Sequence, residues 1–234
     1  MSSTLIDPRR DATPAFGAGG RSPYEQALLD PRRRPTLQLV GSHPALPGVG
    51  EPIDVAAFRG FADDVDRGVL GMTTGSVLDL GCGPGRMVEA AVRLGRRALG
   101  VDLSAVAVKL AARRGVPVLN ASVFDRLPGE GHWGAVLLLD GNVGIGGDPE
   151  ALLRRASTLV RPDGSARIVV EAHRMEGDHR FDAVIVDDAG RRSAIFPWAQ
   201  LGTQALVAVG ASSGLRLVQR RRSGGRRFVV FAPC

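Results

Sequence analysis

A short apolar run that contains an acidic residue and leads into three alternating glycines is the feature that most constrains the fold. The run is Val77–Leu80, with Asp79 as its acid. The glycines are Gly81, Gly83 and Gly85. Residues 87–94 then place apolar side chains at helical spacing. The pattern predicts a strand, a tight turn and a helix. The turn needs glycine because its backbone visits positive φ and lets a ligand lie against bare main chain.

The spacing of the glycines indicates which ligand the turn can hold. Dinucleotide-binding turns carry G-x-G-x-x-G, whereas this turn reads G-x-G-x-G with Asp79 two residues before the first glycine. A carboxylate at that point repels a pyrophosphate but suits a ligand with an ammonium group. The helix after the turn presents free N–H groups and a partial positive charge, which favour a ligand carboxylate. A nicotinamide-dependent oxidoreductase is therefore disfavoured.

A second acid follows the next predicted strand. Residues 98–101 are apolar or glycine, and Asp102 comes directly after them. A carboxylate at that strand tip can accept both hydrogens of a ribose diol, because the glycine turn next to it holds the nucleoside there. Ser104 suits the cap of the following helix better than Asp102 does. Asp102 is therefore interpreted as a ligand-binding residue.

The acid, the G-x-G-x-G turn and the second acid together resemble motif I and the next strand tip of the class I (Rossmann-like) S-adenosylmethionine-dependent methyltransferases. The resemblance covers roughly residues 53–234, and its most specific motifs lie between 77 and 102. It implies an α/β fold, a doubly wound seven-stranded sheet in the order 3-2-1-4-5-7-6 with the last strand antiparallel. It also implies that S-adenosylmethionine is the cofactor.

Later segments agree with this fold. Residues 135–139 are almost wholly apolar, as in a buried central strand, and Asp148-Pro149 is a good start for the next helix. Residues 181–186 and 191–196 flank Asp187–Gly190, which predicts a β-hairpin inserted after strand 5. We further expect helices over 53–70 and from about Trp198 to Ser212, and a terminal antiparallel strand pair.

The resemblance assigns roles to the residues of these motifs. Asp79 is expected to hold the amino group of the cofactor, Asp102 its ribose hydroxyls, and Leu103 is expected to pack near adenine. The adenine contact itself stays open between Asn120, the side chain of Ser122, the backbone at Ser122–Val123 and Asp125. Asp140 and Asn142 are expected at the methionyl end or at the acceptor. The expected cofactor-binding residues are Asp79, Gly81, Cys82, Gly83, Gly85, Asp102, Leu103, Ser122, Val123 and Asp140.

Methyl transfer from a sulfonium is an in-line displacement, so the protein mainly positions the acceptor and excludes water. A base is needed only where the acceptor must lose a proton. His173 and His179, after the fifth strand, are candidate bases, followed by Glu171. We take His173 and Glu171 as the predicted catalytic residues. No His/Cys cluster has metal-ligand spacing, so no metal is expected.

The first 50 residues are rich in Pro, Gly, Ser and Arg and show little periodicity. We therefore expect a flexible arm over 1–50 and one methyltransferase domain over 51–234. Segments ahead of motif I often cover the cofactor or shape the acceptor pocket in related methyltransferases. Tyr24, His43 and Arg32–Arg34 are therefore candidate pocket residues, with an inert tail as the alternative.

The composition of the chain indicates which classes of binding partner are disfavoured. The net charge of +6 comes almost wholly from arginine, in pairs that are scattered and rarely stand beside aromatic residues. This pattern disfavours a nucleic-acid surface. No apolar run approaches the length of a membrane span, and two cysteines form no disulfide framework. We expect a cytoplasmic protein that does not bind a membrane.

The segment after the fourth predicted strand also bears on the acceptor. Asp140-Gly141-Asn142 stands where methyltransferases of nucleobase amino groups or of glutamine often carry Asn/Asp-Pro-Pro-aromatic. A small-molecule methyl acceptor is therefore the leading hypothesis. The alternatives are an RNA methyltransferase and a non-catalytic S-adenosylmethionine-binding protein. The sequence does not predict the oligomeric state.

Overall fold

A seven-stranded, mostly parallel sheet forms the centre of the protein. The computed structural model describes residues 14–17, 22–30, 36–41 and 51–234. The strand order is β5-β4-β3-β6-β7-β11-β10, which equals 3-2-1-4-5-7-6 when these strands are counted along the chain. Only β11 runs against its neighbours β7 and β10. The predicted fold class is confirmed. The strands are β3 (Val77–Leu80), β4 (Ala98–Asp102), β5 (Val118–Asn120), β6 (Ala135–Leu138), β7 (Arg167–Ala172), β10 (Leu215–Ser223) and β11 (Arg226–Pro233).

Helices cover both faces of this sheet. One face packs against α6 (Pro149–Leu159) and α7 (Thr203–Ser212). The other packs against α3 (Asp64–Gly71), α4 (Arg86–Arg93) and α5 (Ala105–Arg113). Every residue of β3 and β6 is buried, as expected of central strands with helices on both sides. Since the sheet is parallel at this point, β3, β4 and β6 end at the same edge.

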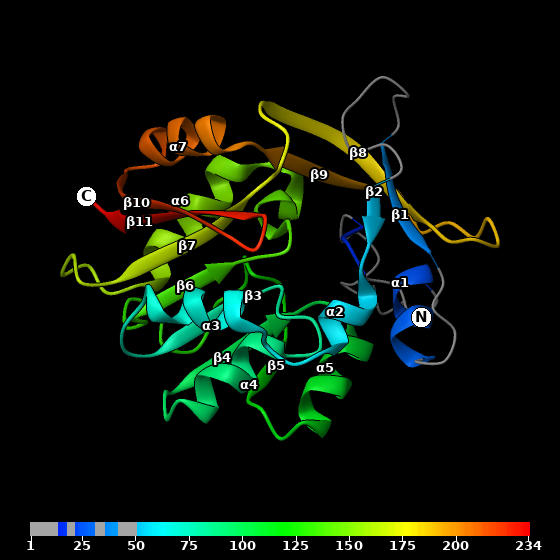
Figure 1. Ribbon diagram of the computed structural model, residues 1–234, viewed down its shortest axis with the longest axis horizontal. Coiled ribbons are helices and arrows are strands. Elements are labelled where there is room, and N and C mark those ends of the chain that lie inside the picture. The colour runs from blue at the N-terminus through cyan, green and yellow to red at the C-terminus, as the bar shows by residue number, and fades with distance from the viewer. Residues whose placement is uncertain (1–13, 18–21, 31–35, 42–50) are drawn as a thin grey trace, which may run out of the picture.

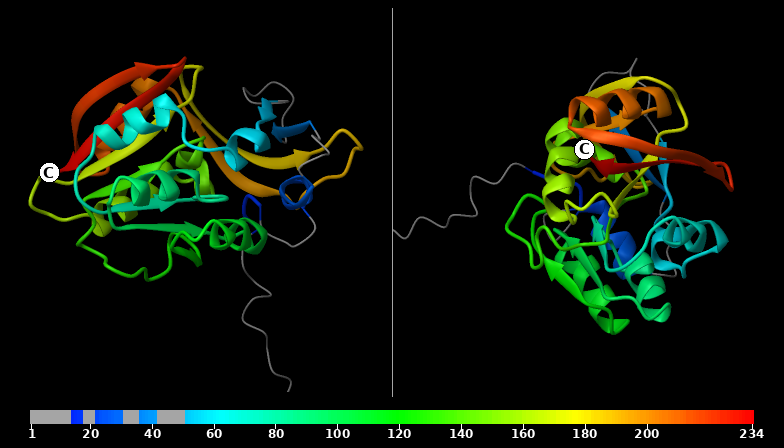
Figure 2. Two further views of the ribbon diagram at one scale, coloured as in Figure 1. Left: turned by 60° about the horizontal axis from the view of Figure 1, so that its bottom comes forward. Right: turned by 90° about the vertical axis from the view of Figure 1, so that its left-hand side faces the viewer.

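A smaller antiparallel sheet stands beside that edge. Its order is β2-β1-β8-β9. In Figure 1 these strands and α1 lie on one side of the molecule, and the left view of Figure 2 shows the same separation. The predicted hairpin is its core, because β8 and β9 pair from Asp178↔Leu201 to Ala183↔Phe196. Its second strand was predicted at 191–196 but lies at Phe196–Leu201, so the connection is longer than expected. The bounds are α1 (Pro23–Leu29), β1 (Leu37–Gly41), β2 (Glu51–Ile53), β8 (Asp178–Val186) and β9 (Phe196–Leu201).

The described part of the N-terminal 50 residues belongs to this second unit. β1 pairs with β8, and Leu37 and Leu28 are fully buried in a cluster with Phe181 and Trp198. These residues therefore contribute to the packed structure. The predicted boundary between an arm 1–50 and a domain 51–234 stays a prediction, and His43 and Arg32–Arg34 lie outside the described residues.

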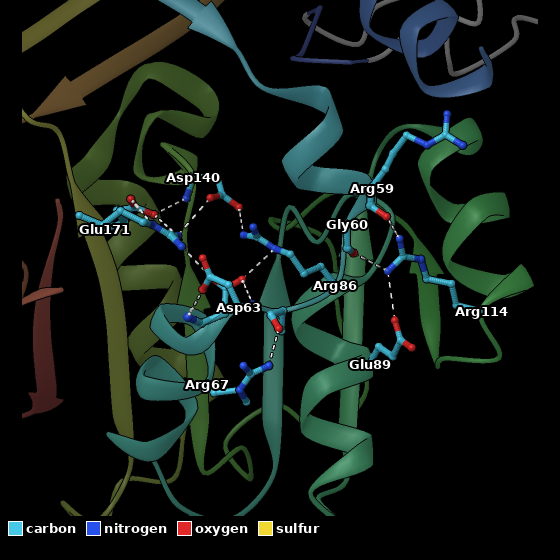
Figure 3. Close-up of polar contacts among 12 residues, drawn as sticks. Arg59, Gly60, Asp63, Arg67, Arg86, Glu89, Arg114, Asp140 and Glu171 are labelled. Atoms are coloured by element: carbon cyan, nitrogen blue, oxygen red, sulfur yellow. Dashed lines mark hydrogen bonds and ion pairs between the residues drawn. The ribbon is translucent and has the colours of Figure 1, made fainter. Parts of the chain in front are cut away.

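Two predicted helices differ from the structure. The segment 53–70 is divided into α2 (Val55–Arg59) and α3. At the break, the guanidinium of Arg114 donates hydrogen bonds to the carbonyl oxygens of Arg59 and Gly60 (Figure 3). The helix predicted to begin at Trp198 begins at Thr203, because Phe196–Leu201 pairs with β8 instead. Within the described part of the chain, no helix has the length and apolar character needed to cross a membrane.

The contact between α7 and β11 gives a test of the packing. A Cβ added at Gly210 would lie 2.6 Å from Cζ of Phe231, whereas Gly71 in α3 has open space around it. We expect Gly210→Ala to lower the free energy of unfolding by about 1–3 kcal/mol through overpacking. Gly71→Ala, the matched control, should leave it unchanged or raise it by up to about 1 kcal/mol. Urea unfolding measures both, and equal effects would contradict the described packing.

Candidate functional site

The glycine turn between β3 and α4 has the backbone geometry that the sequence predicts. Gly81, Gly83 and Gly85 have φ values of 73°, 53° and 85°. A Cβ at Gly81 would lie 2.6 Å from Nδ2 of Asn142, so this position has no room for a side chain. The nearest atom to a Cβ at Gly83 is the Tyr24 hydroxyl, at 3.5 Å. The turn therefore leaves bare main chain at Gly83 beside a cavity.

That cavity has a volume of about 470 Å³ and lies at the edge where β3, β4 and β6 end. Nine of the ten predicted cofactor-binding residues line it: Asp79, Gly81, Cys82, Gly83, Asp102, Leu103, Ser122, Val123 and Asp140. Gly85 does not line the cavity. It is the N-cap of α4 and packs against Ala111 and Val116, so the chain needs it to close the turn.

Asp79 is a buried carboxylate that the protein leaves available. Its residue is 4% exposed, it lines the cavity, and no described residue donates a hydrogen bond to its side chain. Burial raises its pKa to about 7, and the charge of Asp140 adds to this while Arg86 opposes it. A buried charge without a partner is costly. The arrangement is therefore suited to a cationic ligand group that supplies the missing partner.

Asp102 is fixed by the turn itself. Its Oδ2 accepts a hydrogen bond from Gly83 N–H and its Oδ1 accepts one from Ser104 N–H, both at 2.8 Å. Burial raises its pKa, although these two hydrogen bonds oppose the rise. Each carboxylate oxygen keeps acceptor capacity beyond the one bond it makes. Asp102 is thus oriented toward the cavity with the capacity to accept the two hydrogens of a diol.

An ion-pair network surrounds Arg86 and Asp140, two residues that line the cavity (Figure 3). Arg86 contacts Asp140 at 2.6 Å and Asp66 at 3.4 Å. Arg226 contacts Asp66 at 2.7 Å, Glu171 at 2.6 Å and Asp140 at 3.1 Å. Asp140 is the only described non-glycine residue with positive φ, at 54°, and its N–H donates to Glu171 at 2.8 Å. The network holds Asp140 in this strained conformation, which is common at functional sites.

The predicted catalytic residues lie in an adjoining cavity of about 440 Å³. Both oxygens of Glu171 accept hydrogen bonds from Arg226. His173 faces Glu51 through Nε2 at 3.0 Å, while its Nδ1 accepts a hydrogen bond from Met175 N–H. The hydrogen bond to His173 is the largest of the effects that lower the pKa of Glu51 to about 2. A base role for either residue stays a prediction. For His173 it would require the loss of one of these contacts, because both ring nitrogens are in use.

Of the residues considered for the adenine contact, some line the cavity and others do not. Ser122 and Val123 line the cavity, whereas Asn120 and Asp125 do not. Asn120 instead donates to the carbonyls of Asp102 and Leu103, and Asp125 accepts a hydrogen bond from Ser122 N–H. Both residues thus support the loops that carry cavity residues. Their side chains are already used within the protein.

Sequence reasoning missed several residues of the site. Arg86 follows the turn directly, so its position at the start of α4 was a usable signal. Asp66 and Arg226 reach the site only through packing of α3 and pairing of β11. The aromatic wall of the cavity, Phe16, Tyr24, Phe58 and Trp198, comes from four separate segments. Of these, only Tyr24 was a sequence-based candidate.

The chain is similar to known methyltransferases over part of its length. A family model described as a methyltransferase domain matches residues 77–164. Trans-aconitate 2-methyltransferase of Paracidovorax citrulli is 31% identical over 134 residues, which is 56% of this chain and 52% of that protein. Ubiquinone biosynthesis O-methyltransferase of Cupriavidus pinatubonensis is 30% identical over 104 residues, or 42% and 41%. The matches thus span about half or less of these curated relatives.

Solved structures match over more of the chain. An S-adenosylmethionine-dependent methyltransferase from Bacteroides fragilis, solved with S-adenosyl-L-homocysteine, has a TM-score of 0.74 and 20% identity. The match covers 94% of this chain and 99% of that one. The 1,6-didemethyltoxoflavin-N1-methyltransferase of Burkholderia thailandensis has a TM-score of 0.54 at 19% identity, over 77% and 81%. At these identities the likeness concerns the fold.

The raised pKa of Asp79 predicts how the stability of the folded protein depends on pH. Because its folded-state pKa is about 7 and an unfolded aspartate has a pKa near 3.9, ionisation destabilises the folded protein as the pH rises between these values. We expect Asp79→Asn to stabilise the ligand-free protein at pH 8 by on the order of a few kcal/mol. The gain should shrink as the pH falls toward 4. Chemical denaturation at several pH values measures it, and a gain independent of pH would contradict the raised pKa.

Proposed function

We propose that this chain, a class I S-adenosylmethionine-dependent methyltransferase by its matched domain and its fold, transfers a methyl group from S-adenosylmethionine to a small-molecule acceptor. One observation carries the proposal most directly. Two acids flank bare main chain at Gly83, and one of them, Asp79, has no partner among the described residues, while Asp102 is oriented by Gly83 N–H. A ligand that joins an amino acid to a ribonucleoside would offer an ammonium group to Asp79 and ribose hydroxyls to Asp102.

The residues present fit this cofactor. Asp79 would hold the ammonium group, the N-terminus of α4 the carboxylate, and Asp102 the ribose hydroxyls. Leu103, Ser122 and Val123 would lie along the base, since they line the cavity beyond Asp102. When bound, S-adenosylmethionine supplies a methyl carbon whose bond to sulfur breaks as the lone pair of the acceptor attacks, so the sulfur leaves as a neutral thioether.

The protein contributes orientation and exclusion of water in this proposal. The aromatic wall lines the cavity on the side of the smaller sheet. A cavity of about 470 Å³ with buried aromatic walls suits a small molecule. The relatives named for trans-aconitate and for ubiquinone biosynthesis carry names of small-molecule methyltransferases, which supports this class of acceptor. Cytoplasmic location stays a prediction.

The cofactor assignment is tested by binding. We expect isothermal titration to detect S-adenosylmethionine and S-adenosyl-L-homocysteine, and not NAD or NADP. Asp102→Ala should weaken both methionine-derived ligands at least about tenfold, because it removes hydrogen bonds to a charged group. Asp188→Ala is the matched control, since Asp188 is exposed in the hairpin turn away from the cavity. Tight NAD binding, or an Asp102→Ala variant with unchanged affinity, would contradict the proposal.

The acceptor class is tested by transfer. Protein supplied with S-adenosylmethionine carrying a radiolabelled methyl group should label components of a small-metabolite pool. Total RNA from the same source should remain unlabelled. Labelled RNA would favour an RNA methyltransferase, and cofactor binding without labelling of any pool would favour a non-catalytic binding protein.

A further inference from the structure

An aromatic wall forms another part of the cavity, and it meets the proposed cofactor site where the Tyr24 hydroxyl lies near Gly83. It consists of Phe16, Tyr24 in α1, Phe58 in α2 and Trp198 in β9. The ring of Phe16 lies 5.1 Å from that of Tyr24 and 5.3 Å from that of Trp198, between centroids. Phe16, Phe58 and Trp198 also line the adjoining cavity. The wall therefore stands where the two cavities meet.

This wall lines the cavity with aromatic side chains that also pack against one another. Trp198 is only 5% exposed and Tyr24 only 4%, and both residues line the cavity. Aromatic rings prefer offset or edge-to-face contact with other rings, and such pairs are worth about two- to tenfold in affinity beyond the area they bury. The wall therefore favours a planar ligand over a saturated one of similar size.

Trp198 also carries an unused hydrogen-bond donor. No described residue accepts a hydrogen bond from its indole Nε1–H, although the side chain is almost fully buried. Among the described residues, fully buried side-chain polar atoms without a hydrogen-bond partner occur in Glu25, Arg96, Glu150, Arg161 and Gln200. Nε1 of Trp198 is not one of them, so this atom keeps some accessible surface. Buried tryptophan N–H groups usually find a partner. A ligand in the cavity can supply it.

Polar groups on the opposite side of the cavity are already assigned. Asp79 and Asp102 belong to the cofactor in the proposed function, and Asp140 is paired with Arg86 and Arg226. The wall is thus left for the methyl acceptor. We infer that the acceptor is an aromatic or heteroaromatic molecule that packs against this wall and accepts a hydrogen bond from Nε1–H of Trp198 through a ring nitrogen or an oxygen substituent. This inference rests on the proposed function, since it takes the rest of the cavity to be the cofactor site.

Three matched probes test the inference. Acetophenone has a ring and an accepting carbonyl, ethylbenzene has the ring alone, and cyclohexyl methyl ketone has the carbonyl without the aromatic ring. Ligand-observed NMR titration would measure their affinities for the full chain saturated with S-adenosyl-L-homocysteine. We expect acetophenone to bind about two- to tenfold more tightly than either of the other two.

A pair of variants separates the hydrogen bond from the packing. Trp198→Phe keeps a ring but removes the donor, so the preference for acetophenone over ethylbenzene should disappear. Trp133→Phe is the matched control at the other tryptophan, whose Nε1–H already donates to the Pro128 carbonyl at 3.0 Å. It should leave acetophenone binding unchanged. Circular dichroism checks that both variants fold.

The outcomes are distinguishable from failure of the proposed function. If S-adenosyl-L-homocysteine does not bind the wild-type chain, the proposed function is wrong, and so is this inference, which rests on it. If that ligand binds but cyclohexyl methyl ketone equals or exceeds acetophenone, the planar acceptor is wrong. If Trp198→Phe retains the preference for acetophenone over ethylbenzene, the role of the Trp198 N–H is wrong.

Discussion

The unequal distribution of charges at the cavity is the constraint on which the site depends. Two guanidinium groups, those of Arg86 and Arg226, are shared among the carboxylates of Asp66, Asp140 and Glu171. Asp79 lies beside this network but receives no hydrogen bond from a described residue. Its cost of burial is therefore only partly offset within the protein, by the nearby charge of Arg86. The ligand-free protein is thus less stable than its packing alone would make it, and a cationic ligand group removes the penalty.

The sequence predicted those parts of the site that a single segment encodes. The glycine turn, Asp79 and Asp102 lie within 26 consecutive positions, 77–102, and the rules for parallel strands bring their tips to one edge. Contacts between segments far apart in the sequence could not be predicted from these local patterns. Arg226 joins the site through the register of β11 with β7, and Trp198 through the pairing of β9 with β8. The latter pairing also overrode the helical pattern that led to a helix being predicted from Trp198.

In the proposed function, the two sheets supply different parts of the site. The seven-stranded sheet supplies the acids and the turn, which fit the proposed cofactor, and the four-stranded sheet with α1 and α2 supplies the aromatic wall. Figure 1 shows the two sheets side by side. Residues on the first sheet are set by strand tips that a common fold fixes. Those on the second come from segments with their own packing, so acceptor preference can differ between proteins that share the larger sheet.

The most direct test of this account is the pKa of Asp79 measured by carboxyl ¹³C NMR in the presence and absence of S-adenosyl-L-homocysteine. Without ligand the account predicts a pKa of about 7, since the carboxylate is buried and unpaired. With ligand bound, the ammonium group should lower the pKa well below that value. A pKa that is near 4 without ligand, or that stays unchanged when the ligand binds, would contradict the central claim that Asp79 is unpaired until a cationic ligand group binds.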